Sequence, residues 1–197
     1  MFTTDYIETE RLILRRFKED DLSNVFVLMN DDYTCRMTGM PVFKTSEMVK
    51  RFMDNWAERA YAITEKGYDK VIGIIQTPLF WWDRRAEIGY WLLKDCRGKG
   101  YMTEAVKAVS EELFKKWWCN EIRIYVFEGN VASERVALKC GFHPMYDCYK
   151  DAIYSSYGTV ESELCFLKTA GDLEWEHRGK AYFSTTADRE ATFPCHP

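Results

Sequence analysis

Residues 86–117 constrain the fold of this chain more than any other stretch. An apolar, β-rich run, AEIGYWLL, is followed by the turn CRGKGYMTEA and then by residues with helical periodicity. The buried face of the expected helix has apolar residues three or four positions apart: Met102, Ala105, Val106, Val109, Leu113 and Trp117. A strand, a glycine-containing turn and a helix in this order predict a layered fold in which helices cover a sheet.

The turn is suited to binding an anionic group. The start of a helix exposes backbone N–H groups without helical partners, and the helix dipole adds partial positive charge there. Gly98 and Gly100 let the main chain approach a ligand closely, and Arg97 and Lys99 add charge. These residues predict a phosphate cradle, above all for a pyrophosphate.

Three known types of phosphate-binding turn are candidates for residues 97–103. A Walker loop is excluded, because the chain contains no GxxxxGK[ST] string. A dinucleotide fingerprint, GxGxxG, lacks its third glycine at Thr103, and Glu128 lies further away than the ~20 residues expected for a ribose-binding acid. A coenzyme A turn, [QR]xxGx[GA], matches Arg97 and Gly100 but has Met102 at its last position. The second and third types both remain open.

The rest of the chain predicts a mixed sheet with helices on its faces. Asp20 and Asp21 precede a helical run, and Thr45 and Ser46 open a second one that extends to Ala60. Gly67 favours a hairpin between two β-rich runs. The expected strands are residues 10–16, 61–64, 70–77, 86–93, 121–127, 144–150 and 161–168, and a further helix spans 131–139 between Asn130 and Gly141.

Composition excludes several classes of protein. Lys and Arg number 27 against 31 Asp and Glu, so the net charge of −4 offers no basic excess for nucleic-acid binding. The seven cysteines include no CxxC, and the three histidines are not at zinc-ligand spacing, which predicts free thiols and no metal. No apolar run approaches the ~20 residues needed to cross a membrane, so we expect a cytoplasmic protein.

Four segments, in order, resemble the GNAT superfamily of acetyl-CoA-dependent N-acetyltransferases: TERLILRRF, VIGII, AEIGYWLLKDCRGKGYMTEAV and EGNVASERVALKCGF. Within it the chain is most similar to the RimJ/RimL-type branch, whose members acetylate protein N-terminal amines. The resemblance implies an α+β fold with a central mixed, mostly antiparallel sheet of about seven strands, splayed between its fourth and fifth strands, and helices on both faces. It implies a domain at residues 1–175, with 176–197 as a C-terminal extension.

The same resemblance implies where acetyl-CoA binds, with no metal involved. The cofactor would lie where strands 86–93 and 121–127 separate, and the backbone of Leu92 and Leu93 would bind its pantetheine arm and polarise the thioester. Asn130 and Lys139 would contact its other end. The backbone amides expected to hold the pyrophosphate are those of Arg97, Gly98, Lys99, Gly100, Tyr101, Met102 and Thr103.

Two residues are candidates for acid–base work in acetyl transfer. Glu87 corresponds to a catalytic glutamate of several superfamily members and would take the proton of the attacking amine. Ser133 matches the NxxS of the RimJ/RimL branch and would protonate the departing thiolate, because Ala137 stands where many members have a tyrosine. As alternatives, Glu87 is a strand residue paired with a nearby arginine, and Ser133 caps backbone in a first helical turn.

The acceptor is less defined than the donor. An α-amine, with a pKa of ~7.7–8.0, is deprotonated more easily than lysine at ~10.4, which favours a protein N-terminus. A small amine such as an aminoglycoside, a polyamine or an amino acid is the alternative. Residues 31–43 are expected to shape the acceptor pocket, and Phe80, Trp81 and Trp82 to line it or to form a homodimer contact. A non-catalytic acetyl-CoA binder and a nucleotide-binding Rossmann protein are the competing classes.

Overall fold

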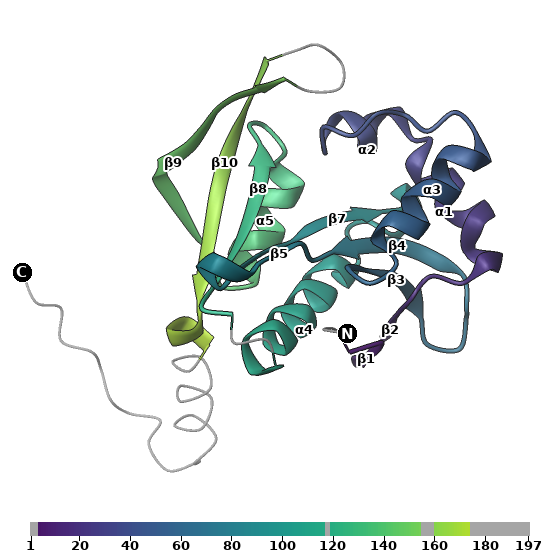
Figure 1. Ribbon diagram of the computed structural model, residues 1–197, viewed down its shortest axis with the longest axis horizontal. Coiled ribbons are helices and arrows are strands. Elements are labelled where there is room, and N and C mark those ends of the chain that lie inside the picture. Colours follow the sequence, from purple (N-terminus) through teal and green to yellow (C-terminus); the bar gives the residue numbers. More distant parts are fainter. Residues whose placement is uncertain (1–3, 117–118, 155–159, 174–197) are drawn as a thin grey trace, which may run out of the picture.

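The computed structural model describes residues 4–116, 119–154 and 160–173, whose ten strands form two five-stranded sheets (Figure 1). The first sheet has the order β1-β2-β3-β4-β7 and is antiparallel throughout. Its strands are β1 (Tyr6–Glu8), β2 (Leu12–Arg15), β3 (Ala60–Glu65), β4 (Val71–Gln76) and β7 (Gly89–Leu92). This confirms the mixed, mostly antiparallel α/β class predicted from the sequence.

The second sheet has the order β5-β6-β8-β10-β9 and contains one parallel pair, β6 with β8. Its strands are β5 (Leu79–Phe80), β6 (Arg85–Glu87), β8 (Glu121–Phe127), β9 (His143–Tyr154) and β10 (Val160–Thr169). The expected closing pair is therefore present as β9 and β10, which run antiparallel. The expected boundary at residue 175 and Trp117 lie outside the described residues.

The predicted strand 86–93 is divided into β6 and β7, and this division is the reason why two sheets form. Ile88 is the residue between them, and its N–H still donates to the Arg123 carbonyl of β8 at 2.9 Å. From Gly89 onward the chain pairs with β4 instead, beginning opposite Gln76. One continuous extended stretch thus serves both sheets, a switch that the apolar pattern does not reveal.

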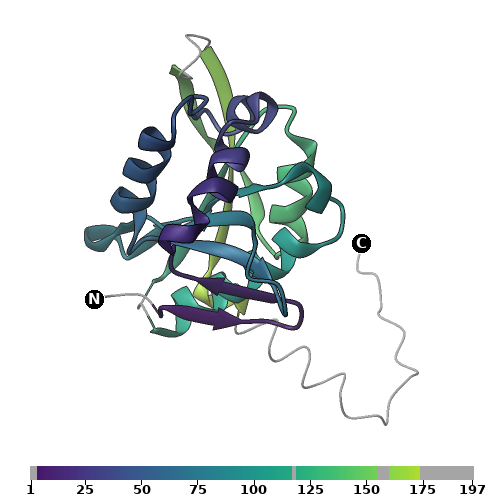
Figure 2. The same ribbon diagram turned by 90° about the vertical axis from the view of Figure 1, so that its right-hand side faces the viewer.

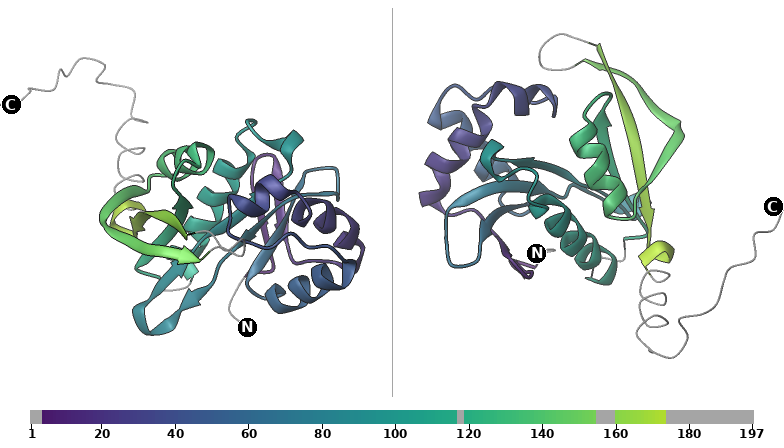
Figure 3. Two further views of the ribbon diagram at one scale, coloured as in Figure 1. Left: turned by 90° about the horizontal axis from the view of Figure 1, so that it is seen from above. Right: turned by 180° about the vertical axis from the view of Figure 1, so that it is seen from behind.

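Helices cover both faces of the sheets (Figure 2). On one face α1 (Leu22–Met29) and α3 (Ser46–Trp56) bury Val25, Leu28 and Phe52 against β3, β4 and Trp91. On the other face lie α4 (Tyr101–Lys116) and α5 (Val131–Lys139), which Figure 3 shows from behind. Their core cluster draws apolar residues from both sheets, including Leu14, Ile75, Ile122, Ile124 and Phe166.

Local capping explains several helix ends. The Thr45 hydroxyl accepts the Met48 N–H at the start of α3, as predicted, although α3 ends at Trp56 and Ala60 belongs to β3. Gly141 has a φ of +77° after α5, as predicted for the residue that ends this helix. The short α2 (Asp32–Arg36) was not predicted. It begins at Asp31, whose carboxylate accepts the Thr34 N–H at 3.0 Å.

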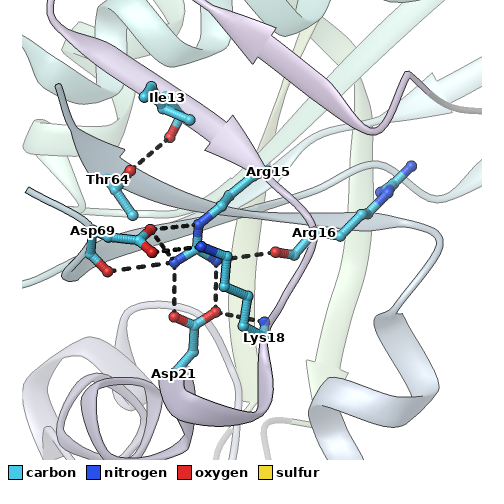
Figure 4. Close-up of polar contacts among 7 residues, drawn as sticks. All are labelled: Ile13, Arg15, Arg16, Lys18, Asp21, Thr64 and Asp69. Carbon is cyan, nitrogen blue, oxygen red and sulfur yellow. Dashed lines mark hydrogen bonds and ion pairs between the residues drawn. The ribbon is translucent and has the colours of Figure 1, made fainter. Parts of the chain in front are cut away.

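A buried ion-pair network fixes the entry into α1 (Figure 4). The Arg15 guanidinium of β2 donates to both carboxylate oxygens of Asp21, at 2.7 and 2.9 Å, and its Nε donates to Asp69 at 2.8 Å. Asp21 in turn accepts the Lys18 N–H at 2.7 Å. Because the bidentate geometry satisfies both buried partners, the network ties β2 to the β3–β4 turn and to the first residues of α1.

The described residues contain neither a helix long and apolar enough to cross a bilayer nor a group of three or more side chains that could hold a metal ion. Cys35, Cys96, Cys119, Cys140 and Cys165 are free thiols.

Candidate active site

The strands β7 and β8 diverge after Ile88. Arg85, Ala86 and Glu87 of β6 pair with residues 121–123 of β8, but beyond this point β7 is paired with β4 alone. The edges of β7 and of the second half of β8 that turn toward one another are therefore not joined by a ladder. Backbone groups at such an edge are available to a ligand that runs between the strands.

The cradle, residues 97–103, lies at the start of α4. Gly98 and Gly100 have φ values of +75° and +81°, which other residues adopt only with strain. A Cβ at Gly98 would meet nothing within 4 Å, and one at Gly100 would lie 3.4 Å from the Arg11 guanidinium. Glu104 is the first helical donor, with its N–H on the Gly100 carbonyl. The Arg97 N–H already donates to the Lys94 carbonyl at 3.2 Å, so the groups available to an anionic phosphate are the N–H groups of residues 98–103.

Glu104 anchors the cradle to the first sheet. Its carboxylate accepts from the Thr9 hydroxyl at 2.6 Å, from the Arg11 N–H at 2.8 Å and from the Arg11 Nε at 2.7 Å. Arg11 also donates to the Lys99 carbonyl at 2.9 Å and lies over the Tyr101 ring. Burial tends to raise the pKa of Glu104, but the three hydrogen bonds outweigh burial and leave this pKa lowered.

The Arg97 side chain turns from the cradle toward α2. Its Nε donates to the Leu92 carbonyl at 3.1 Å, and its Nη2 lies 3.2 Å from Asp31 and also donates to the Thr34 hydroxyl. The guanidinium lies 5.5 Å from the centre of the Tyr33 ring. Hydrogen bonds from Thr34 and then from Arg97 lower the pKa of Asp31. Arg97 therefore connects the end of β7, the predicted pantetheine site, with the region predicted to bind the acceptor.

Residues 31–40, here called the bridging segment, contact both sides of the divergence. On the β7 side the Trp91 indole N–H donates to the Thr38 hydroxyl at 3.0 Å. On the β8 side the Asn130 amide donates to the Met37 carbonyl at 3.3 Å. Gly39, with a φ of +67°, lies so close to the Phe127 ring that an added Cβ would be 2.8 Å from it. The segment thus spans the two strands that separate.

Glu87 lies at the end of β6, immediately before the divergence. Its neighbours Ala86 and Ile88 are buried in the core beneath α4 and α5, so the alternation of a strand turns Glu87 toward the opposite face. The carboxylate is partly exposed, and the Arg85 guanidinium lies 3.9 Å from it. The arginine pairing predicted as the alternative role of Glu87 is therefore present, but it is long and leaves the carboxylate partly exposed.

Ser133 lies in the first turn of α5, where Asn130 caps the helix by accepting the Ser133 N–H at 3.2 Å. The Ser133 hydroxyl does not cap backbone. It lies 2.7 Å from the Tyr90 hydroxyl of β7. Tyr90 was missed from the sequence, because in the run GYWL it is one aromatic strand residue among several and its partner is 43 residues away.

The helix α5 connects the two ends of the candidate site. At its C-terminal end the Cys140 thiol contacts the Thr103 carbonyl of the cradle at 3.4 Å, which brings the neighbouring Lys139 to that end. At its N-terminal end Asn130 contacts the bridging segment. Asn130 and Lys139, predicted to act together, are thus separated by the length of the helix. Leu92 ends β7 and Leu93 follows it, so in the sequence both lie between the bridging segment and the cradle.

Comparison with known sequences shows which family the chain matches. Residues 11–143 match the family described as acetyltransferase (GNAT) domain. The chain is also similar to YoaA of Bacillus subtilis (strain 168), which is named an uncharacterized N-acetyltransferase. The two are 30% identical over 144 residues, which span 69% of this chain and 81% of YoaA.

Solved structures with the same fold include two that contain a ligand. RimL, described as ribosomal L7/L12 α-N-protein acetyltransferase in complex with coenzyme A, has a TM-score of 0.73 at 21% identity, over 83% of this chain and 97% of RimL. MccE, described as microcin C7 self-immunity acetyltransferase in complex with acetyl-CoA and AMP, has a TM-score of 0.72 at 20% identity, over 81% of this chain and 93% of MccE. At these identities the likeness shows a shared fold.

Proposed function

Because this chain belongs to the GNAT family of acetyltransferases, we propose that it transfers an acetyl group from acetyl-CoA to the α-amine of a protein N-terminus. The amine attacks the acetyl carbon directly, within a complex that holds donor and acceptor together. The observation that carries this proposal is the open glycine cradle at the start of α4, joined by α5 to the point where β7 and β8 diverge.

The residues of the cradle would hold the donor. Backbone N–H groups of residues 98–103 bind the pyrophosphate, since the Arg97 N–H donates to Lys94. The backbone of Leu92 binds the pantetheine arm, since the Leu93 N–H donates to the Ile72 carbonyl and the Leu93 carbonyl accepts the Cys96 N–H. Acetyl-CoA supplies the activated acetyl group as a thioester. An oriented backbone donor at the end of β7 stabilises the negative charge that develops on the carbonyl oxygen, and the fixed geometry supplies most of the remaining acceleration.

Glu87 and Ser133 would move the protons of the reaction. The bond from nitrogen to the acetyl carbon forms while the bond from that carbon to sulfur breaks. Glu87 accepts the proton that the amine loses and then releases it to solvent. Ser133 passes its hydroxyl proton to the sulfur, which leaves as a thiol, and regains a proton from water. The two residues lie on opposite sides of the sheet, Glu87 on the face of the bridging segment and Ser133 on α5, so each can serve one substrate.

The acceptor assignment follows from relatives and from chemistry. RimL, with the same fold, is named for acetylation of a protein α-amine, and an α-amine loses its proton more easily than a lysine side chain near neutral pH. MccE supports the alternative of a small-molecule amine, because its complex contains AMP beside acetyl-CoA. Release of free coenzyme A thiol, measured with N-terminal peptides, polyamines, amino acids and aminoglycosides, distinguishes the two.

Glu87→Gln tests the chemistry. We expect this variant to lower kcat about 100-fold at pH 7 and much less at pH 9, where more of the amine is already deprotonated. The matched control is Glu8→Gln, which removes a carboxylate of β1 that is paired with Lys66. We expect it to leave kcat unchanged. An equal loss of kcat at both pH values contradicts the role of Glu87.

A separate result would identify an acetyl-CoA binder instead of an enzyme. In that case acetyl-CoA raises the thermal stability of the protein, but no coenzyme A thiol is released in the presence of any amine.

A further inference from the structure

The Tyr90–Ser133 hydrogen bond joins β7 to α5 beside the divergence of β7 and β8. We propose that Tyr90 is a positioning residue, which holds the Ser133 hydroxyl in the orientation needed for the leaving sulfur. The proposal rests on the function proposed above and adds to it a residue to which the sequence analysis assigned no role.

The side chain of Tyr90 is directed toward α5 by the register of its strand. Tyr90 pairs with Ile75 of β4, and both pack against the core cluster that lies beneath α4 and α5. Its neighbours Gly89 and Trp91 face the other side, where Trp91 packs with α1 and α3. The ring is therefore fixed by packing, and only its hydroxyl reaches a polar partner.

Two oxygens of Ser133 lie within reach of the single hydroxyl proton of Tyr90. The distance is 2.7 Å to the Ser133 hydroxyl and 3.2 Å to its carbonyl. A carbonyl inside a helix already accepts an N–H from four residues further on, so the hydroxyl is the acceptor in greater need of a donor. When Tyr90 donates to the Ser133 oxygen, the Ser133 proton is free to point away from Tyr90 toward a substrate.

The protonation state of Tyr90 is suited to this role. Burial raises the pKa of Tyr90, and the hydrogen bond with Ser133 offsets this effect only in part. The phenol therefore stays neutral at physiological pH and acts as a constant donor. It orients Ser133 and does not itself supply the proton that the sulfur takes up.

Ser133 needs an external partner, because nothing else along α5 fixes its rotamer. The Ser133 N–H is already capped by Asn130, so the hydroxyl has no role in capping. One turn further along, Ala137 is fully buried and has no hydroxyl to offer. A serine side chain has three staggered rotamers, and the hydrogen bond to Tyr90 selects one of them.

A double-mutant cycle between Tyr90→Phe and Ser133→Ala tests the proposal. The measurements are kcat, the KM for acetyl-CoA and thermal unfolding, with the amine that wild type acetylates fastest. We expect Tyr90→Phe to lower kcat about three- to tenfold, the range of one neutral hydrogen bond, without changing this KM. In the Ser133→Ala background the same substitution should leave kcat unchanged, because its partner is absent.

Tyr61→Phe is the matched control. Tyr61 is also a buried strand tyrosine, but it lies on β3, distant in the fold from α5. Its hydroxyl donates to the Thr4 carbonyl at 2.8 Å. We expect this variant to lose about as much thermal stability as Tyr90→Phe and to keep the kcat of wild type. A kcat loss for Tyr90→Phe that persists in the Ser133→Ala background would show a general structural effect and overturn the proposal.

The outcomes separate this inference from the proposed function. An active wild type whose kcat is unaffected by Tyr90→Phe overturns the role of Tyr90 alone. A wild type that releases no thiol with any amine of the panel overturns the proposed function, and the role of Tyr90 with it.

Discussion

The cradle and the bridging segment are built in opposite ways. The cradle is formed by main-chain geometry, namely two glycines with positive φ and the N–H groups at the start of α4. The bridging segment is held in place by side chains from distant parts of the sequence. Arg97 contacts Asp31, which is 66 positions away, and Asn130 contacts Met37, which is 93 positions away. The difference teaches that the donor side of the site is encoded locally, while the predicted acceptor side depends on contacts made only in the folded chain.

The cradle should therefore be sensitive to backbone changes, and Gly100→Val has the largest expected effect. Its φ of +81° strains a β-branched residue, and the added atoms meet the Arg11 guanidinium and crowd a bound phosphate. We expect the Kd for acetyl-CoA, measured by calorimetry, to rise more than about 100-fold, equal to about 2.7 kcal/mol.

Gly67→Val is the control for this substitution. Gly67 has a φ of +83° in the β3–β4 turn and no atom within 4 Å of an added Cβ, so the variant has the same backbone strain at a distance from α4. It should lose stability and keep its affinity for acetyl-CoA. If both variants bind acetyl-CoA like wild type, the cradle does not hold the pyrophosphate.

The bridging segment should instead be sensitive to side chains, and Arg97→Met is expected to have an intermediate effect. Removal of the guanidinium frees Asp31, Thr34 and the Leu92 carbonyl, while the backbone of the cradle is retained. We expect the KM for the acceptor to rise about tenfold, or about 1.4 kcal/mol, and the Kd for acetyl-CoA to change much less. Adding Asp31→Asn should have little further effect, because the contact with Arg97 is already lost and an amide oxygen can still accept the Thr34 N–H.

Arg36→Met provides the comparison, because it removes an exposed ion pair with Asp32 on the same short helix. Exposed pairs of this kind contribute little, so both kinetic constants should stay near wild type. A larger change in acetyl-CoA affinity than in acceptor KM for Arg97→Met would assign the Arg97 side chain to the donor and remove the distinction between the two regions.

The smallest expected effect concerns the anchor of the cradle, and it depends on pH. The pKa of Glu104 is lowered in the folded protein, so its ionised form stabilises the fold above the unfolded pKa of about 4.3, and this stabilisation is lost as pH falls through the folded pKa. Glu104→Gln should lower the free energy of unfolding by about 1 kcal/mol at pH 7 and have less effect at pH 3.

Chemical denaturation at several pH values measures this difference, with Glu111→Gln on the same helix as the control. Glu111 forms only an exposed ion pair with Lys115 and should give a small effect at pH 7. If the difference in free energy of unfolding between wild type and Glu104→Gln grows toward acid pH, the hydrogen bonds assigned to Glu104 are contradicted.

The sequence was informative wherever the structure is determined by neighbours in the chain. Asn130 caps α5, Thr45 caps α3 and Gly67 lies in the predicted hairpin, because each acts on residues within a few positions. The cradle could be predicted for the same reason, since its glycines and the start of its helix are contiguous in the chain. The roles assigned to Glu87, Ser133 and the cradle residues stay predictions until the variants are measured.

Features that depend on tertiary contacts could not be predicted. The apolar pattern of residues 86–93 is the same whether one sheet or two use the strand, so the switch at Ile88 left no local signal. The short α2 begins with an aspartate cap but also needs Arg97 to hold it. Tyr90 finds Ser133 only because β7 and α5 are brought together by the fold.

The shared path of β6 and β7 has a consequence for how the molecule unfolds. Ile88 is the single residue between pairing with β8 and pairing with β4, and one apolar cluster draws side chains from both sheets. Neither sheet can melt without exposing the apolar face of the other and releasing the strand that both use. The two sheets are thus one cooperative unit, and the elements on either side of the divergence lose their order together.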